Sequence, residues 1–333
     1  MWQVIGQSRA VSLLKRSLER GTLAHAYLLE GPSGVGKMTL ALNIAQAVNC
    51  EAAEPPCGEC DSCRKIALGK HADVEIIGLN SSEGKPRTEI GIDRVREVQH
   101  SSSLPPFEGR CRVFIIDGGE YLSTEAANCL LKTLEEPAGG VFILLTASAR
   151  LLLTTVVSRC QRLDLPPLAV AEVEAALGSR WGVDPQRARL LARLCRGCLG
   201  WAVSAAGEDS WLRQRTERVE RLLGISTGGF EERFAYAGEL AAQFSQDRGL
   251  VWEALDLWLD WWRDLLLVKA GCSDAITNVD MLGTLAERAR GYSMSQIGGF
   301  IRSLQATKDN LRLNANPRLA LEVLMLDIPR WSS

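Results

Sequence analysis

A glycine-rich heptapeptide, GPSGVGK at residues 31–37, constrains the fold of this chain more than any other feature. The segment before it, HAYLLEG, has the apolar character of a short buried strand, and the segment after it, TLALNIAQAVNC, has a helical pattern. Between a strand and a helix, glycines let backbone N–H groups surround phosphates while a lysine reaches the terminal ones. Residues 26–50 therefore predict the strand, phosphate-binding loop and helix that open a nucleotide-type α/β unit.

The residues expected to contact a nucleotide in this loop are Gly31, Gly34, Gly36, Lys37 and Thr39. The position after the lysine normally carries Ser or Thr, whose hydroxyl ligates magnesium. Here it is Met38, and a thioether is a poor ligand for a hard cation. Because Thr39 comes one position late, we expect a loop that can still hold ATP but has a compromised magnesium site.

A second apolar strand, VFIID at residues 113–117, ends in a carboxylate that can hold magnesium through water. Asp117 is therefore a further candidate for nucleotide binding. In P-loop ATPases of the AAA+ type a glutamate follows this aspartate and polarises the attacking water, but Gly118 supplies no base. Glu120 lies three residues after Asp117, and its side chain is expected to face away from the nucleotide. Met38 and Gly118 together indicate a fold that keeps the phosphate cradle and has lost hydrolysis.

Strand and helix signals alternate up to about residue 164 and then only helical signals remain. Strands are predicted in VEIIGL, RVFIIDG and VFILLTA, and a helix in AANCLLKTLEEP, which Pro137 ends. This alternation favours a parallel sheet. The composition shift predicts three domains: an α/β P-loop domain over 1–164, a small helical domain over 165–207 and an all-α domain over 208–333.

Four of the ten cysteines cluster directly after the P-loop helix: Cys50, Cys57, Cys60 and Cys63. Four thiolates in a short insertion, residues 50–63, can close around a tetrahedral zinc ion, and no open coordination position is left, so the zinc is expected to be structural. Disulfides and C-x-x-C redox catalysis are the alternatives, and a reducing compartment disfavours the first. Most of the remaining cysteines are expected to be buried small apolar side chains.

Two further features are ambiguous when taken alone. The triplet Ser158-Arg159-Cys160 follows an apolar strand and a short helical stretch, and a lone arginine is most often a surface group. The segment VWEALDLWLDWWRDLLLVKAG carries four tryptophans, which suit a subunit interface and ordinary core packing equally well: Trp252, Trp258, Trp261 and Trp262.

Composition excludes several classes of protein. Of 333 residues, 46% are hydrophobic and 23% charged, a balance typical of a globular protein and not of a disordered chain. The net charge of -2 gives no global attraction for nucleic acid or an anionic membrane. No apolar stretch approaches the roughly 18 residues of a membrane helix, and no signal pattern opens the chain, so a cytoplasmic protein is expected.

In combination, GPSGVGK, the inserted cysteines, AANCLLKTLEEP, Ser158-Arg159-Cys160 and the terminal NANPRLALEVLML resemble the delta prime family of bacterial DNA polymerase III clamp-loader subunits. The resemblance covers nearly the whole chain. It implies a RecA-like AAA+ domain, a small helical lid and a helical collar that joins a five-subunit ring with gamma or tau and delta subunits. The sliding clamp and primer–template DNA are then reached through the complex.

The resemblance also implies a role for the triplet. Delta prime subunits resemble stators that present the arginine of this motif, here Arg159 between Ser158 and Cys160, to ATP bound by the adjacent motor subunit. Motor subunits carry an intact GK[ST] loop, an acidic pair and a lid arginine, whereas Trp201 lies near the expected place of that arginine. The resemblance implies that this chain has no catalytic activity of its own. It would act as one subunit of a DNA polymerase, which is a nucleotidyltransferase complex, through its partners.

Two other functions stay open at this point. One is a catalytically active P-loop ATPase such as a gamma or tau motor, which Met38 and Gly118 disfavour. The other is a zinc-bearing nucleic-acid adaptor unrelated to replication, which the near-neutral charge disfavours.

Overall fold

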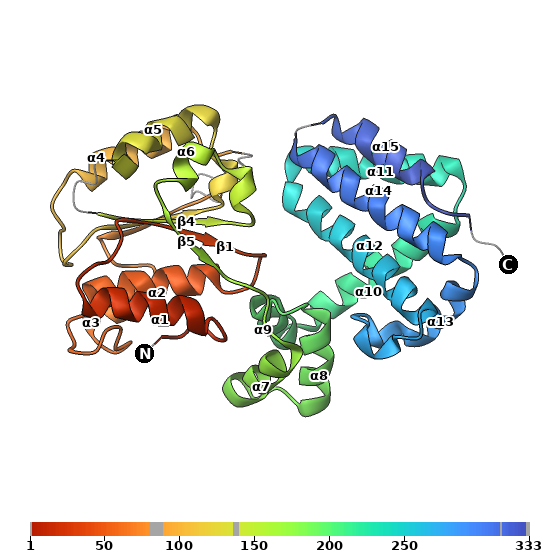
Figure 1. Ribbon diagram of the computed structural model, residues 1–333, viewed down its shortest axis with the longest axis horizontal. Helices are drawn as coiled ribbons and strands as arrows, with labels where there is room; N and C mark the ends of the chain where they lie inside the picture. Colours follow the sequence, from red (N-terminus) through yellow and green to blue (C-terminus); the bar gives the residue numbers. More distant parts are fainter. Residues whose placement is uncertain (1, 80–88, 136–139, 314, 331–333) are drawn as a thin grey trace. The chain divides into compact units, whose positions relative to one another are not determined.

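The computed structural model describes residues 2–79, 89–135, 140–313 and 315–330, and the chain divides into two compact units (Figure 1). The first unit contains the residues up to 172 together with 197–200, and the second contains 173–196 with the residues from 201 onward. Within the described part of the chain, no helix combines the length and the apolar character needed to cross a membrane.

The first unit is built on a five-stranded sheet in which all four strand pairs are parallel. Its strand order is β2-β3-β4-β1-β5, so every connection crosses over one of the two faces. The strands are β1 (Ala26–Glu30), β2 (Val74–Ile77), β3 (Val113–Asp117), β4 (Val141–Thr146) and β5 (Gln161–Asp164). The predicted parallel α/β domain is confirmed, and this order gives the sheet of a RecA-like P-loop domain.

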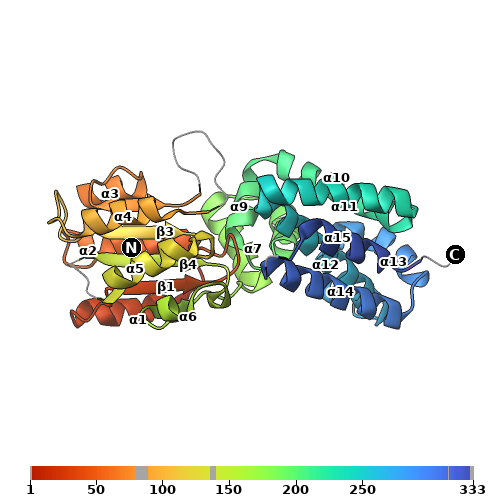
Figure 2. The same cartoon turned by 90° about the horizontal axis from the view of Figure 1, so that it is seen from above.

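Helices cover both faces of this sheet because successive strand side chains point to opposite faces. Tyr27 and Leu29 lie in the core on one face, and Leu28 lies in the core on the other. The first face is covered by α1 (Ser8–Glu19), α2 (Lys37–Asn49) and α3 (Asp61–Ala67), and the second by α4 (Ile92–Ser102), α5 (Thr124–Glu135) and α6 (Thr154–Val157) (Figure 1; Figure 2 gives the view from above). Pro137, predicted to end α5, lies outside the described residues.

Two short 3-10 helices, η1 (Gly119–Tyr121) and η2 (Ala149–Leu151), follow β3 and β4. Because the strands are parallel, their carboxyl ends meet at one edge of the sheet, where β1 leads into the glycine loop.

The chain after β5 is helical, as the loss of strand signals predicts. The helices are α7 (Val170–Trp181), α8 (Pro185–Leu194), α9 (Leu199–Gly207), α10 (Asp209–Thr227), α11 (Phe230–Gln246), α12 (Arg248–Lys269), α13 (Leu282–Arg290), α14 (Met294–Arg312) and α15 (Pro317–Leu326), with 3-10 turns η3 (Ser273–Ala275) and η4 (Val279–Met281). The predicted cap at the start of α15 is present, since Leu319 N–H donates to the Asn316 side-chain oxygen at 3.1 Å.

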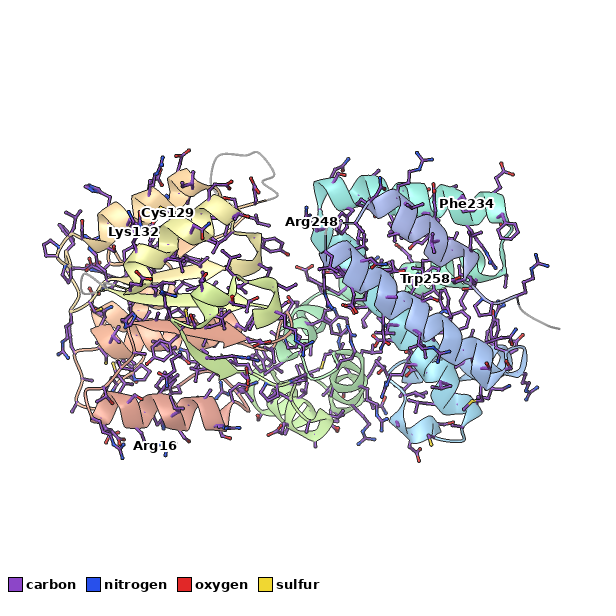
Figure 3. All side chains as sticks on the ribbon, turned by 45° about the horizontal axis from the view of Figure 1, so that its top comes forward. Arg16, Cys129, Lys132, Phe234, Arg248 and Trp258 are labelled. Atoms are coloured by element: carbon purple, nitrogen blue, oxygen red, sulfur yellow. The ribbon has the colours of Figure 1, made fainter. Side chains whose placement is uncertain are left out.

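Three of the four clustered tryptophans lie in the hydrophobic core of the second unit. Trp258, Trp261 and Trp262 expose 2%, 2% and 1% of their surface. Trp258 stacks on Tyr236, and its position among the helices is labelled in Figure 3. The interface alternative is therefore wrong for these three. Trp252 is only partly buried, and the Arg312 guanidinium lies over its ring, 5.5 Å from the ring centre.

Replacing Trp262 with alanine is expected to destabilise the second unit by about 3–5 kcal/mol, the usual cost of emptying a large aromatic site. Its ring lies 4.7 Å from Phe300 and 5.1 Å from Tyr292 between centroids, so neighbouring rings lose contact on two sides. Urea unfolding followed by circular dichroism measures the change. Trp181→Ala, at a site 44% exposed, is the control and is expected to stay within about 0.5 kcal/mol of the parent. Equal midpoints for the two variants would contradict the core assignment.

Candidate functional site

The glycine loop is held at the carboxyl edge of the sheet. Gly31 N–H donates to the Thr146 carbonyl at the end of β4 at 3.1 Å, and a Cβ at Gly31 would collide with the Leu165 carbonyl. Gly36 has φ of +107° and caps α2, whose first bond runs from Leu40 N–H to the Gly36 carbonyl at 2.9 Å. Close packing at one glycine and left-handed backbone at the other explain why this sequence forms a loop of this shape.

The side chain of Lys37 turns back into the glycine loop that precedes it. Its Nζ donates to the carbonyls of Gly31 at 2.5 Å and Pro32 at 2.9 Å. Burial lowers the pKa of Lys37, and the negative charges of Glu120 and Asp117 act in the opposite direction. The ammonium is therefore held by carbonyls of its own loop, and the charges of two acidic side chains act on it.

The structure accounts for Met38. Its side chain packs against the apolar core on the α1 and α2 face of the sheet, so the thioether contributes to packing. Thr39 is partly buried in the first turn of α2. Gly31, Gly34, Gly36 and Lys37 are thus gathered in one loop, as predicted. Trp201, which lies near the place expected for the lid arginine of motor subunits, is partly buried in α9 and belongs to the second unit.

Asp117 ends β3 at the same sheet edge. Desolvation raises the pKa of its carboxyl, while Lys37 lowers it. The expectation that Glu120 faces elsewhere is wrong. Its Oε1 accepts from Ala147 N–H, directly after β4, at 3.1 Å, and its charge acts on Lys37 together with that of Asp117. Gly118, directly after β3, was the sequence signal for a tight turn, and it could have indicated that the chain returns Glu120 to this end of the sheet.

Residues 197–200 also reach the loop, and sequence reasoning missed them. Gly200 N–H donates to the Gly34 carbonyl at 2.7 Å, and Cys198 is among the groups whose charge acts on Lys37. The left-handed φ of +79° at Gly197 lets the chain pass close to Leu168, whose N–H donates to the Gly197 carbonyl at 3.0 Å. No local pattern could reveal a contact across about 160 residues.

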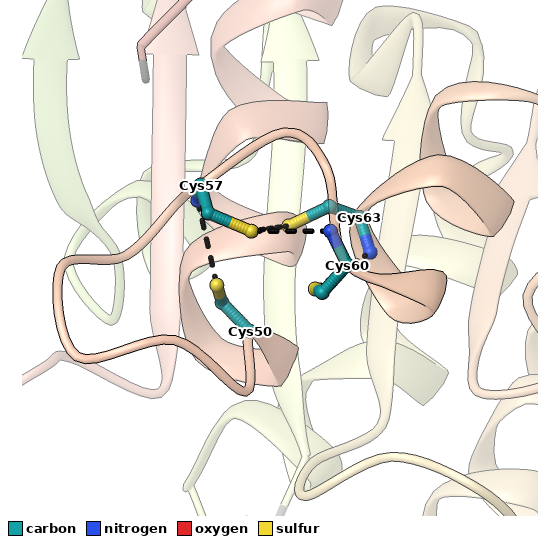
Figure 4. Close-up of side chains that lie close together, drawn as sticks. All are labelled: Cys50, Cys57, Cys60 and Cys63. Atoms are coloured by element: carbon teal, nitrogen blue, oxygen red, sulfur yellow. Dashed lines mark hydrogen bonds between the residues drawn. The ribbon is translucent and has the colours of Figure 1, made fainter.

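The four predicted zinc ligands come together in the segment from the end of α2 to the first turn of α3, which contains Cys63 (Figure 4). Their sulfur atoms all lie within 4.8 Å of one another, and the Sγ atoms of Cys57 and Cys63 are 3.9 Å apart. A tetrahedron with Zn–S bonds of about 2.3 Å has edges of about 3.8 Å, so the donor set fits a zinc ion. All ten cysteines are free thiols, which contradicts the disulfide alternative.

Backbone amides point at these sulfurs. Cys60 N–H donates to the Cys57 sulfur at 3.2 Å, and Cys63 N–H donates to the Cys60 sulfur at 3.4 Å. The amides of Cys60 and Glu59 lower the pKa of Cys57 to about 6, whereas burial raises the pKa of Cys63 to about 12. Amide donors around thiolate ligands are the outer-shell contacts that orient such a site.

The prediction that most of the six remaining cysteines are buried is confirmed in full only for Cys195. Cys195 is buried, and four others are partly buried: Cys111, Cys129, Cys160 and Cys198. Cys272 is exposed, because it lies in the turn after α12, so the general expectation is wrong there.

Ser158, Arg159 and Cys160 lie between the end of α6 and the start of β5. Ser158 Oγ donates to the Thr155 carbonyl at 3.0 Å, and Arg159 Nη1 donates to the same carbonyl at 2.9 Å. The second arm of the guanidinium pairs with Glu135 at the end of α5. Burial raises the pKa of Cys160 to about 12, so this thiol acts as an apolar anchor.

The structure separates this triplet from the glycine loop. Arg159 precedes β5, whereas the loop follows β1, and these two neighbouring strands run parallel with Tyr27 beside Gln161 and Glu30 beside Asp164. Three strand residues span about 10 Å. Arg159, at the amino ends of the strands, therefore lies on the opposite side of the sheet's length from Gly31, at their carboxyl ends.

Comparison with known proteins agrees with the motifs. A family model described as DNA polymerase III, delta subunit, matches residues 6–169, and one described as the C-terminal part of that subunit matches 232–330. The chain is 29% identical to DNA polymerase III subunit delta prime of Bacillus subtilis over 322 residues, which cover 96% of this chain and 95% of that protein.

The tau subunits are also similar. DNA polymerase III subunit tau of Escherichia coli is 33% identical over 280 residues, which cover 76% of this chain and 41% of tau, so this chain spans well under half of that relative. Among solved structures, a gamma subunit-related protein of Thermotoga maritima aligns with a TM-score of 0.45 at 19% identity over 96% of this chain and 98% of that one. With two family models that together span most of the sequence and a delta prime relative matched over nearly its full length, the chain belongs to the delta prime family of bacterial DNA polymerase III clamp-loader subunits.

Proposed function

We propose that this chain is a largely non-hydrolysing stator of the clamp loader, which presents Arg159 to ATP bound by a neighbouring subunit. The observation that carries the proposal is the separation of Arg159 from its own phosphate-binding loop at opposite edges of the sheet. A guanidinium on that edge cannot serve the chain's own nucleotide, so its target belongs to another subunit.

The chemistry of phosphoryl transfer explains why an arginine suits this role. Charge spreads over the γ-phosphate oxygens during transfer, and a planar guanidinium can bridge two of them. Arg159 is one-third exposed, and its partner Glu135 is about half exposed. An exposed ion pair of this kind is worth about 1 kcal/mol or less, so Arg159 can exchange the carboxylate for a phosphate. Ser158 and Cys160 act as positioning residues that fix the turn around it.

The remaining parts of the proposal follow from the same family assignment. Cys50, Cys57, Cys60 and Cys63 hold a structural zinc, and the glycine loop with Asp117 is the chain's own nucleotide site. Its partners are gamma or tau and delta subunits in a cytoplasmic five-membered ring, which engages the sliding clamp and primer–template DNA. We divide the chain into an AAA+ domain over 1–164, a lid over 165–207 and a collar over 208–333.

Assembly tests this proposal directly. The chain is mixed with the gamma or tau and delta subunits of the same organism, and the mass of the complex is measured by native mass spectrometry. One copy of this chain in a five-subunit assembly is expected. A complex of unchanged mass in the absence of this chain would contradict its place in the ring.

The isolated chain is expected to hydrolyse ATP only at background rate. Met38, which packs against the core, has no hydroxyl to ligate magnesium, and Gly118 carries no base. Phosphate release is measured on the purified chain with and without magnesium, and a gamma or tau preparation serves as the positive control. Turnover above about one per second, within the ordinary range of enzymes, would favour the motor alternative instead.

A further inference from the structure

Two amide side chains are buried in α2, the helix that follows the glycine loop. Asn43 and Gln46 expose only 1% and 2% of their surface. A buried amide is costly unless its oxygen and its nitrogen find hydrogen-bond partners, whereas an apolar side chain of similar size carries no such cost. The partners of these two side chains therefore identify what their polar groups contribute.

The two amides form one continuous chain of hydrogen bonds, which we call the α2 relay. Asn43 Oδ1 accepts from the backbone N–H groups of Gln3 at 2.8 Å and Val4 at 3.2 Å. Asn43 Nδ2 donates to Gln46 Oε1 at 3.0 Å, and Gln46 Nε2 donates to the Cys63 carbonyl at 2.9 Å. A backbone N–H only donates and a carbonyl only accepts, so these partners fix the orientation of both amides. Hydrogen bonds in such a chain polarise and strengthen one another.

The two ends of the α2 relay lie at the two sites described above. Cys63 is a fully buried member of the cysteine cluster, in the first turn of α3. At the other end, Val4 packs on the glycine loop, since a Cβ at Gly36 would lie 3.3 Å from Val4 Cγ2. The relay therefore joins the backbone of a zinc ligand to a residue in contact with the phosphate-binding loop.

We propose that Asn43 and Gln46 are positioning residues that couple the zinc site to the glycine loop. A metal-bound Cys63 has a fixed backbone, and the relay then holds residues 3 and 4 in place, so that Val4 keeps Gly36 in the loop conformation. Phosphates bind to the amides of such a loop, so its order favours nucleotide binding. By linkage, zinc and nucleotide strengthen each other's binding by the same factor. This inference rests on the zinc and nucleotide sites proposed above and is independent of Arg159.

Hydrogen exchange tests the α2 relay without nucleotide. The full chain is compared with and without zinc, after removal of the chelator and at a temperature where circular dichroism shows both forms folded. Zinc removal is expected to speed exchange of the Gln3 and Val4 amides about fivefold or more, the effect of losing roughly one hydrogen bond. Gln46→Met keeps a side chain of similar length but removes both hydrogen bonds. We expect this variant to retain zinc and to show the faster exchange with and without it.

Equilibrium binding of a fluorescent ADP analogue, measured without magnesium, is the second readout. Zinc removal is expected to weaken binding by the parent chain about fivefold or more, the lower range of coupling between two sites. Zinc-loaded Gln46→Met is expected to bind as weakly as the zinc-free parent. Gln99→Met is the matched control, because Gln99 Nε2 donates to the Cys129 carbonyl at 2.7 Å on the opposite face of the sheet. It should keep the zinc dependence of the parent in both measurements.

The outcomes separate this inference from the sites on which it rests. A parent chain that takes up no zinc, or that binds no nucleotide in either form, would contradict the corresponding site and the coupling with it. Nucleotide binding and exchange that do not depend on bound zinc would overturn the coupling alone. So would a zinc-loaded Gln46→Met variant that behaves like the parent. If Gln46→Met does not fold, Gln46→Asn replaces it. That side chain is shorter by one methylene and cannot reach both partners, so the same loss of coupling is expected.

Discussion

Arg159→Ala is expected to lower ATP turnover at the neighbouring site of a reconstituted clamp loader by about a thousandfold, the lower end of the contribution measured for arginine fingers. Folding and assembly are expected to persist, because the side chain is one-third exposed and its polar contacts with described residues are to the Thr155 carbonyl, Ser158 and Glu135. The measurement is pre-steady-state phosphate release with clamp and primed DNA, together with the mass of the complex. The burst contributed by one site should disappear while the mass stays the same.

Three matched variants make this experiment specific. Arg150→Ala removes an exposed arginine from the same unit and is expected to leave the burst intact. Arg159→Lys should rescue poorly, because an ammonium lacks the planar fork that spans two oxygens. Glu135→Gln frees Arg159 from its ion pair and should not reduce turnover. Clamp loading at the parent rate by an assembled Arg159→Ala complex would make Arg159 a mere surface charge.

Purified without chelator, the chain is expected to contain one zinc ion, and Cys63→Ser is expected to lose it together with much of the stability of the insertion. Cys63 is buried, its sulfur lies 3.9 Å from that of Cys57, and its carbonyl accepts from Gln46 Nε2 on α2 at 2.9 Å. Loss of the metal therefore affects both the loop and the helix behind the glycine loop. Structural zinc contributes roughly 10 kcal/mol of apparent binding free energy in small zinc domains, so a large fall in Tm is expected.

Metal analysis and thermal unfolding, with and without a chelator, measure these effects. Cys272→Ser is the matched control, because this thiol is exposed and distant in sequence from the cluster, and it should keep both zinc and Tm. Less than about half an equivalent of zinc in the parent, or sulfurs joined at the disulfide distance of about 2 Å, would contradict the metal site.

Local features of the sequence determined most of the elements of this protein. The glycine loop, strands β1 to β4 and the four cysteines depend on turn chemistry and on periodicity within some 20 residues, and each lies where it was predicted, whereas the short strand β5 was not predicted. The cysteine cluster could be assigned because all its members come from one segment. The nature of the fold followed from the alternation of strands and helices, although the alternation does not fix the order of the strands.

Tertiary structure decided what these elements do together. The parallel pairing of β1 with β5 placed Arg159 and the glycine loop at opposite ends of these strands, and a long-range backbone contact brought residues 197–200 to Gly34. Trp258 and its neighbours could equally have formed an interface until the surrounding helices enclosed them. Glu120 was misjudged because its position depends on a left-handed turn and on an amide supplied by another strand. Sequence periodicity reports which residues are buried, but which buried or charged groups meet depends on contacts between segments far apart in the chain.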